Sequence, residues 1–177
     1  WTDETAVLAP TPDSPDFYSC CDPGVIKIGR YYYIGYTSTV HPDGIINDVF
    51  VARSLKPDGP YEKWSGNGWG GRPKAIVDYT GNPDSFGAGE PSFVVMGETL
   101  YMYYAWLEDG KRETRVCIAD ATDENWPATL EYKGVAITSP DSTCDSADVK
   151  YVDDYGKFIA VATNKRFTQD SFVDVFV

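Results

Sequence analysis

A hairpin preceded by an acidic residue occurs three times in this chain, and this repeat constrains the fold more than any other feature. In the first copy, Asp22-Pro23 precedes two short apolar stretches joined by a tight turn at Gly29-Arg30. A second copy begins at Glu90, which stands in the place of Asp22, and a looser third copy spans 145–162. Short apolar runs around Gly-containing turns are typical of antiparallel strands. We therefore expect an all-β repeat protein.

The spacing of the repeats indicates the architecture. Asp22 and Glu90 are 68 positions apart, and Glu90 and Asp148 are 58 apart. Repeats of four antiparallel strands at this period are typical of β-propeller blades, which pack face to face around a central channel. We expect residues 1–177 to form a partial propeller. Its blades would span about 18–77, 84–138 and 142–177, with the last one incomplete.

The first unit resembles the five-bladed propeller glycosidases, above all glycoside hydrolase family 43 and its relatives that act on arabinose and xylose residues. The residues that carry this resemblance are 22–27, Asp-Pro-Gly-Val-Ile-Lys, with three tyrosines at 31–33, and the stretch 47–62. The resemblance implies a five-bladed fold, of which this chain contains about the first three blades. It also implies that Asp22 is the general base.

In that family the second blade is expected to supply an Asp that tunes the acid, and the third blade a Glu that donates the proton. Here the order is swapped, because the second blade offers Glu90 and the third offers Asp148, with Asp145 three positions earlier. The swap leaves two interpretations open, a divergent enzyme or a propeller that binds sugar without cleaving it.

The chemistry of glycoside hydrolysis assigns roles to these acids. One carboxylic acid must protonate the leaving oxygen, and one carboxylate must activate water or attack the anomeric carbon. A third carboxylate keeps the acid protonated through like-charge repulsion. On this logic Asp22 is the base, Glu90 is the acid because of its longer reach, and Asp148 is the tuner. The resemblance implies an inverting mechanism. The alternative is that these acids are solvated or only cap turns.

Further residues are candidates for binding substrate. Flat aromatic rings suit the C–H faces of sugars, although most aromatic side chains in blades pack between sheets. The predicted substrate-binding residues are Asp145, Trp69, Phe86, Trp106 and Tyr18.

Composition excludes several other classes of function. A net charge of −12 argues against nucleic acid, and no run of apolar residues is long enough to span a membrane. A single histidine, His41, leaves no material for a Ser-His-Asp triad or a His-based metal site. The four cysteines lack the spacing of a zinc site, and a bridge from Cys20 or Cys21 to Cys144 is an alternative to free thiols. No cofactor is expected, while structural calcium stays open.

Together these features predict a secreted glycoside hydrolase acting on arabinose- or xylose-containing plant polysaccharide or oligosaccharide. The alternatives are a carbohydrate-binding propeller without catalysis and a structural or protein-interaction propeller. The chain begins at Trp1, without Met, and is expected to be a processed product. Its apolar stretch 173–177 would leave an unpaired edge. The expected partners are therefore the carbohydrate and the missing C-terminal blades, the latter as a second polypeptide.

Overall fold

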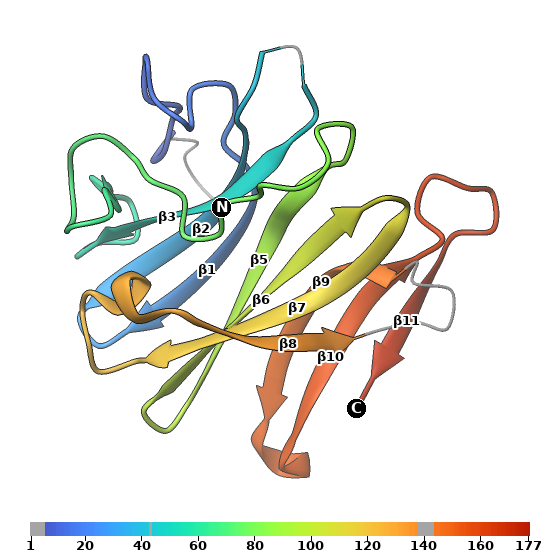
Figure 1. Cartoon of the computed structure of the whole chain (residues 1–177). Helices are drawn as coiled ribbons and strands as arrows, with labels where there is room; N and C mark the ends of the chain where they lie inside the picture. Colours follow the sequence, from blue (N-terminus) through green and yellow to red (C-terminus); the bar gives the residue numbers. More distant parts are fainter. Residues whose placement is uncertain (1–5, 43, 138–143) are drawn as a thin grey trace.

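The computed structural model describes residues 6–42, 44–137 and 144–177, and its strands form three antiparallel units that lie side by side (Figure 1). In each unit, consecutive strands pair with one another. The first unit comprises β1 (Cys21–Ile28), β2 (Tyr31–Thr39), β3 (Asn47–Ser54) and β4 (Glu62–Lys63). The second comprises β5 (Gly87–Met96), β6 (Thr99–Glu108), β7 (Lys111–Asp120) and β8 (Glu131–Ile137). The third comprises β9 (Cys144–Val152), β10 (Lys157–Asn164) and β11 (Phe172–Phe176).

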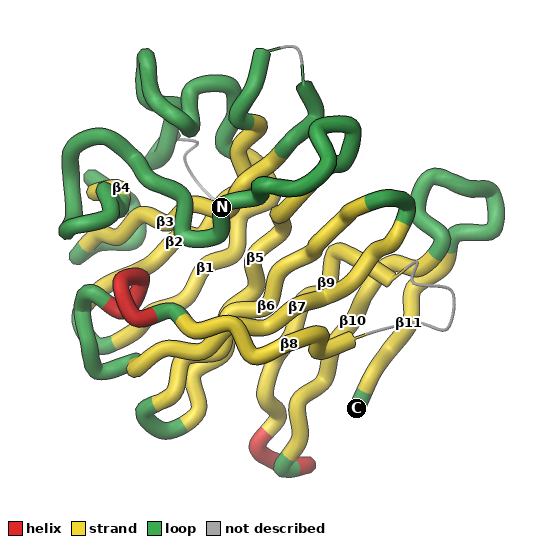
Figure 2. The backbone as a smooth tube through the Cα atoms, viewed as in Figure 1, coloured by secondary structure: helices red, strands yellow, loops and turns green. Residues whose placement is uncertain are grey.

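The connections between the strands are turns, loops and two short 3-10 segments, η1 (Trp126–Thr129) and η2 (Asp153–Tyr155) (Figure 2). The expected turn between β1 and β2 is present, with Gly29 in the left-handed region at φ 56°. One parallel bridge, between Asn47 and Gly87, joins the first unit to the second. The limits expected for the second and third blades, 138 and 142, lie outside the described residues.

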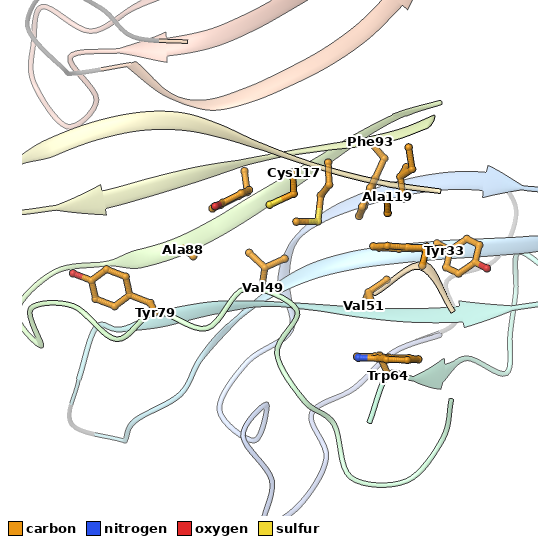
Figure 3. Packing of buried hydrophobic residues seen from close by; sticks show 13 residues of the cluster. Tyr33, Val49, Val51, Trp64, Tyr79, Ala88, Phe93, Cys117 and Ala119 are labelled. Atoms are coloured by element: carbon orange, nitrogen blue, oxygen red, sulfur yellow. The ribbon is translucent and has the colours of Figure 1, made fainter. Parts of the chain in front are cut away.

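The core lies between the faces of neighbouring units. One buried cluster fills the space between the first two units, where Tyr33, Val49 and Val51 meet Phe93 and Cys117 (Figure 3). A second cluster, which includes Val94 and Val149, packs the second unit against the third. Alternate residues along a strand enter the same cluster, such as Val49 and Val51 of β3, because successive side chains point to opposite faces of a sheet. Burial between units therefore fixes the position of each sheet relative to the next.

Two glycines, in β1 and β2, let these strands approach β5 closely. A Cβ atom on Gly35 would lie 2.6 Å from the ring of Phe93, and one on Gly24 would lie 1.9 Å from the carbonyl oxygen of Pro91. Since real Cβ atoms do not approach neighbours this closely, glycine is required at both positions. The contact brings β1 alongside β5, so Asp22 and Glu90, near the starts of these two strands, are neighbours in space.

The segment before β1 packs on the outer side of the first unit. Leu8 and Cys20 join a small cluster around Tyr36 and Phe50. Within it the fully buried carboxylate of Asp16 accepts hydrogen bonds from the Tyr36 hydroxyl, at 2.8 Å, and from the Lys63 ammonium. All four cysteines are free, so the alternative of a bridge to Cys144 is wrong. In the described part of the chain, no helix is long and apolar enough to cross a membrane.

Candidate active site

A β-bulge occurs at the same place in the first strand of each unit. The pairing register shifts between Cys21 and Gly24 in β1 and between Gly89 and Ser92 in β5, and β9 shows the corresponding shift opposite 161–163. At each bulge two residues oppose one on the neighbouring strand, which bends the strand and redirects a side chain. The bulges therefore redirect residues near the start of the first strand in each unit.

One residue at each bulge has a positive φ, which is uncommon for residues other than glycine. These residues are Asp22 at 47°, Glu90 at 57° and Ser146 at 54°. The same backbone device thus holds an Asp, a Glu and a Ser in the three units.

This register corrects the alignment of the third repeat. From the sequence, Asp148 was matched with Asp22 and Glu90, but the equivalent position is that of Ser146, and Asp148 corresponds to Gly24 and Ser92. The acidic residue served as the marker for the repeat, and the third unit has a serine there. A repeat whose marker residue is replaced cannot be aligned by residue type alone.

Asp148 lies at the rim of the site. Its carboxylate accepts hydrogen bonds from Lys150 Nζ at 2.6 Å and from Ser92 Oγ at 2.8 Å, and its side chain is 67% exposed. Burial acts to raise the pKa of Asp148, but the hydrogen bonds from Lys150 and Ser92 outweigh it and lower the pKa below its usual value.

Two adjoining pockets lie where the three units converge, and both are lined by Asp22, Glu90 and Arg166. The smaller pocket, of about 180 Å³, is walled by Phe86, Phe167 and residues of the first two units. The larger pocket, of about 430 Å³, is more open and reaches Ser146 and Asp148 of the third unit. The two predicted acids Asp22 and Glu90 therefore face the same space.

Glu90 is held by groups from both neighbouring units. Its backbone N–H donates to Thr37 Oγ1 of β2 at 2.8 Å. Its carboxylate accepts a hydrogen bond from Ser146 Oγ at 2.6 Å and another from Arg166 Nη1 at 2.5 Å. The same Arg166 nitrogen donates to Ser146 Oγ at 2.8 Å. Both carboxylate oxygens are thus engaged.

Sequence reasoning missed Arg166, which lies in the loop between β10 and β11. Burial acts to lower its pKa, but Glu90, Asp145 and Asp22 outweigh burial and raise the pKa above the usual value. Phe167, which walls the smaller pocket, follows it directly and was missed too. The loop contains no motif, so the sequence offered no signal beyond a basic residue next to an aromatic one.

Asp145 is fully buried beside the pockets but does not line them. Arg112 Nη1 donates to its carboxylate at 3.0 Å, and Ser146 Oγ lies 3.3 Å from its other oxygen. Burial, and then the negative charge of Glu90, raise the pKa of Asp145 above its usual value. Its place is behind Ser146 and Glu90.

Of the four predicted aromatic residues, Phe86 lines the smaller pocket, while Trp69, Trp106 and Tyr18 do not line either pocket. The Trp69 indole N–H donates to the Glu124 carbonyl at 3.0 Å, and its ring packs edge-on against Trp64. The Arg115 guanidinium carbon lies over the Trp106 ring, 3.9 Å from its centroid. Tyr18 is half exposed and packs edge-on against Phe17.

Within residues 6–42, 44–137 and 144–177, no group of three or more His, Cys, Asp or Glu side chains is arranged to hold a metal ion. The hydrogen bonds that fix Glu90 and Asp145 come instead from arginine and serine side chains.

No model of a known protein family matches the chain. No curated protein matches it either. Several solved structures are similar to the chain. Zg3597, a family 117 glycoside hydrolase from the marine bacterium Zobellia galactanivorans, is 18% identical, with a TM-score of 0.68 over 99% of this chain and 48% of its own.

Two further structures extend the comparison. An α-L-arabinofuranosidase from Lactobacillus brevis is 11% identical, with a TM-score of 0.64 over 93% of this chain and 55% of its own. A thermostable family-43 glycoside hydrolase is 16% identical, with a TM-score of 0.60 over 88% of this chain and 49% of its own. The chain spans about half the length of these structures. At such identities the likeness concerns the fold, and at that level it confirms the expectation from sequence: the chain has the β-propeller fold of glycoside hydrolases.

Proposed function

We propose that the chain belongs to a glycoside hydrolase acting on arabinose- or xylose-containing plant polysaccharide or oligosaccharide. The observation that carries the proposal is that Asp22 and Glu90, at equivalent bulges of adjacent units, line the same two pockets. The similar structures, which include an arabinofuranosidase, support this class of reaction. Secretion, and completion of the propeller by further blades, are part of the same proposal.

Asp22 is the proposed catalytic base. In an inverting reaction its carboxylate takes a proton from water as the water attacks the anomeric carbon, and an acid on the opposite side protonates the leaving oxygen. The two carboxyl groups of such a pair lie roughly 6.5–9.5 Å apart, which leaves room for the water. The open pocket next to Asp22 suits a group that must meet both water and sugar.

Carbohydrate binding without cleavage is the second candidate. It is favoured by the contacts of Glu90, whose two carboxylate oxygens both accept hydrogen bonds from Ser146 and Arg166. A carboxylate in an ion pair must lose that pairing before it can act as a proton donor. If Glu90 keeps these contacts, an enzyme with this fold needs a different acid to protonate the leaving oxygen. Further blades would have to supply that acid.

The first test is hydrolysis of p-nitrophenyl arabinofuranoside and xyloside by the wild type and by Asp22→Asn. Loss of a general base lowers rates about 10²–10⁴-fold, and a loss of this size is expected. Asp109→Asn is the matched control, because Asp109 also has a positive φ, at 50°, but lies in an exposed turn. Its activity should stay within about twofold of wild type. Hydrolysis that Asp22→Asn leaves intact would contradict the assignment.

A further inference from the structure

The contacts of Glu90 define a task for this residue other than proton donation. Ser146 Oγ donates to one carboxylate oxygen at 2.6 Å, and Arg166 Nη1 donates to the other at 2.5 Å. With one partner on each carboxylate oxygen, the side chain of Glu90 is fixed in orientation, while it still lines both pockets.

Arg166 complements Glu90 with donors. Among the described residues, the hydrogen bonds of its guanidinium are made by Nη1 alone, to Glu90 and Ser146. The guanidinium has further N–H donors on its other nitrogens. Its side chain is about one third exposed and lines both pockets. The pockets therefore contain a fixed acceptor and a donor side by side.

The charges around this pair indicate what kind of sugar it accepts. The carboxylates are those of Asp22, Glu90 and Asp145, and the guanidinium groups are those of Arg166 and Arg112. Asp148 and Lys150 balance one another at the rim. Asp145 and Arg112 form an ion pair behind the pockets, and the pockets themselves are lined by the carboxylates of Asp22 and Glu90 and the guanidinium of Arg166, so an anionic sugar gains no net attraction from the site.

We propose that Glu90 and Arg166 form a binding pair for adjacent hydroxyls of a neutral sugar ring, in which Glu90 accepts a hydrogen bond from one hydroxyl and Arg166 donates one to the next. Ser146 is a positioning residue, because it contacts both members of the pair. This inference rests on the proposed sugar-binding function, and it names the class of sugar and the residues that bind its hydroxyls.

The test is calorimetric titration of L-arabinose, D-xylose and D-glucuronate into the purified protein and its variants. Wild type is expected to bind a neutral sugar, and to bind glucuronate at least tenfold more weakly. Arg166→Met and Glu90→Gln should each weaken binding at least tenfold, and the double variant should be no weaker than the worse single variant. Arg166→Lys should restore part of the affinity, and Ser146→Ala should cost less than either.

Arg30→Met is the control, since Arg30 also forms an ion pair, with Glu124, but lies outside both pockets. Its binding should stay within about twofold of wild type. The inference is overturned if wild type binds neither neutral sugar, if glucuronate binds as tightly, or if Arg166→Met binds like wild type. Intact binding without hydrolysis would instead refute the enzyme and leave the binding pair standing.

Discussion

At the scale of single residues, buried carboxylates are stabilised in different ways in this fold. Asp16 is paired with Lys63, and Asp145 is paired with Arg112. Asp48, at the start of β3, accepts a hydrogen bond from the backbone N–H of Tyr79 at 2.8 Å. Burial, and then the nearby charge of Asp78, raise the pKa of Asp48 to about 6. The ionised form of Asp48 is therefore costly in the folded protein.

This cost predicts a pH-dependent effect of Asp48→Asn. Because the folded pKa lies above the usual 3.8, Asp48 favours the folded state fully below pH 3.8, and this contribution is lost as the pH rises through about 6. Asparagine keeps an acceptor for Tyr79 without the charge. The variant should be more stable than wild type by about 1–3 kcal/mol at pH 7.5 and show no such gain at pH 3.5. Urea unfolding at both pH values measures this, and an equal difference at both would contradict it.

At the scale of elements, the hairpins were predictable from sequence and the bulges were not. Gly29 and the apolar runs around it define a two-residue turn, and this signal concerns neighbours in sequence. A bulge depends on how one strand pairs with the next, so it leaves no clear mark in the chain. Asp22 and Glu90 were chosen from the sequence because they are acids next to proline. Ser146 has no such mark, so Asp148 was chosen in its place.

The same limit applies to contacts between elements. Arg166 reaches Glu90 across 76 positions of sequence, from a loop without a motif. Trp69 and Trp106 have the flat rings that can stack on sugars, yet Trp69 packs against Trp64 and Trp106 against Tyr79. Residue type suggested the chemistry of the site, while packing between units decided which side chains line the pockets.

Close packing of β2 against β5 predicts the effect of Gly35→Ala. The added Cβ would lie 2.6 Å from the Phe93 ring, so the two units must separate slightly. Overpacking of this kind costs about 1–3 kcal/mol, measured as the free energy of unfolding in urea. Gly29→Asn is the control, because Gly29 has nothing within 4 Å and asparagine tolerates a positive φ. Equal stability of the two variants would count against close packing at Gly35.

At the scale of the whole molecule, the sheet of the third unit ends in an unpaired edge strand. Among the described strands, β11 pairs with β10 on one side only. Its side chains Phe172, Val173 and Val175 are 45%, 65% and 64% exposed. An exposed apolar edge strand offers unpaired backbone groups to another chain. The fold of this chain therefore leaves a surface on which a further strand can pair.

This edge predicts self-association of the chain in solution. Replacing Val173 and Val175 with lysine places charge on the edge, which opposes pairing of strands. The double variant should sediment as a monomer at concentrations where wild type forms larger species. Leu55→Lys is the control, because Leu55 is equally exposed, at 59%, but lies in a turn away from β11. A wild-type chain that stays monomeric would refute this prediction.

The repeated bulge also separates the choice of side chain from the folding of the backbone. The three positions with positive φ already carry Asp22, Glu90 and Ser146, so the scaffold accepts an acid or a neutral residue there without rebuilding a strand. The backbone at each bulge thus accepts different side chains, although the side chains of Ser146 and Glu90 contact one another. A single codon change at Ser146 would give the centre a third acid and take away the hydroxyl that orients Glu90. An exchange at this one position would therefore change the charge where the three units converge while the bulge itself is kept.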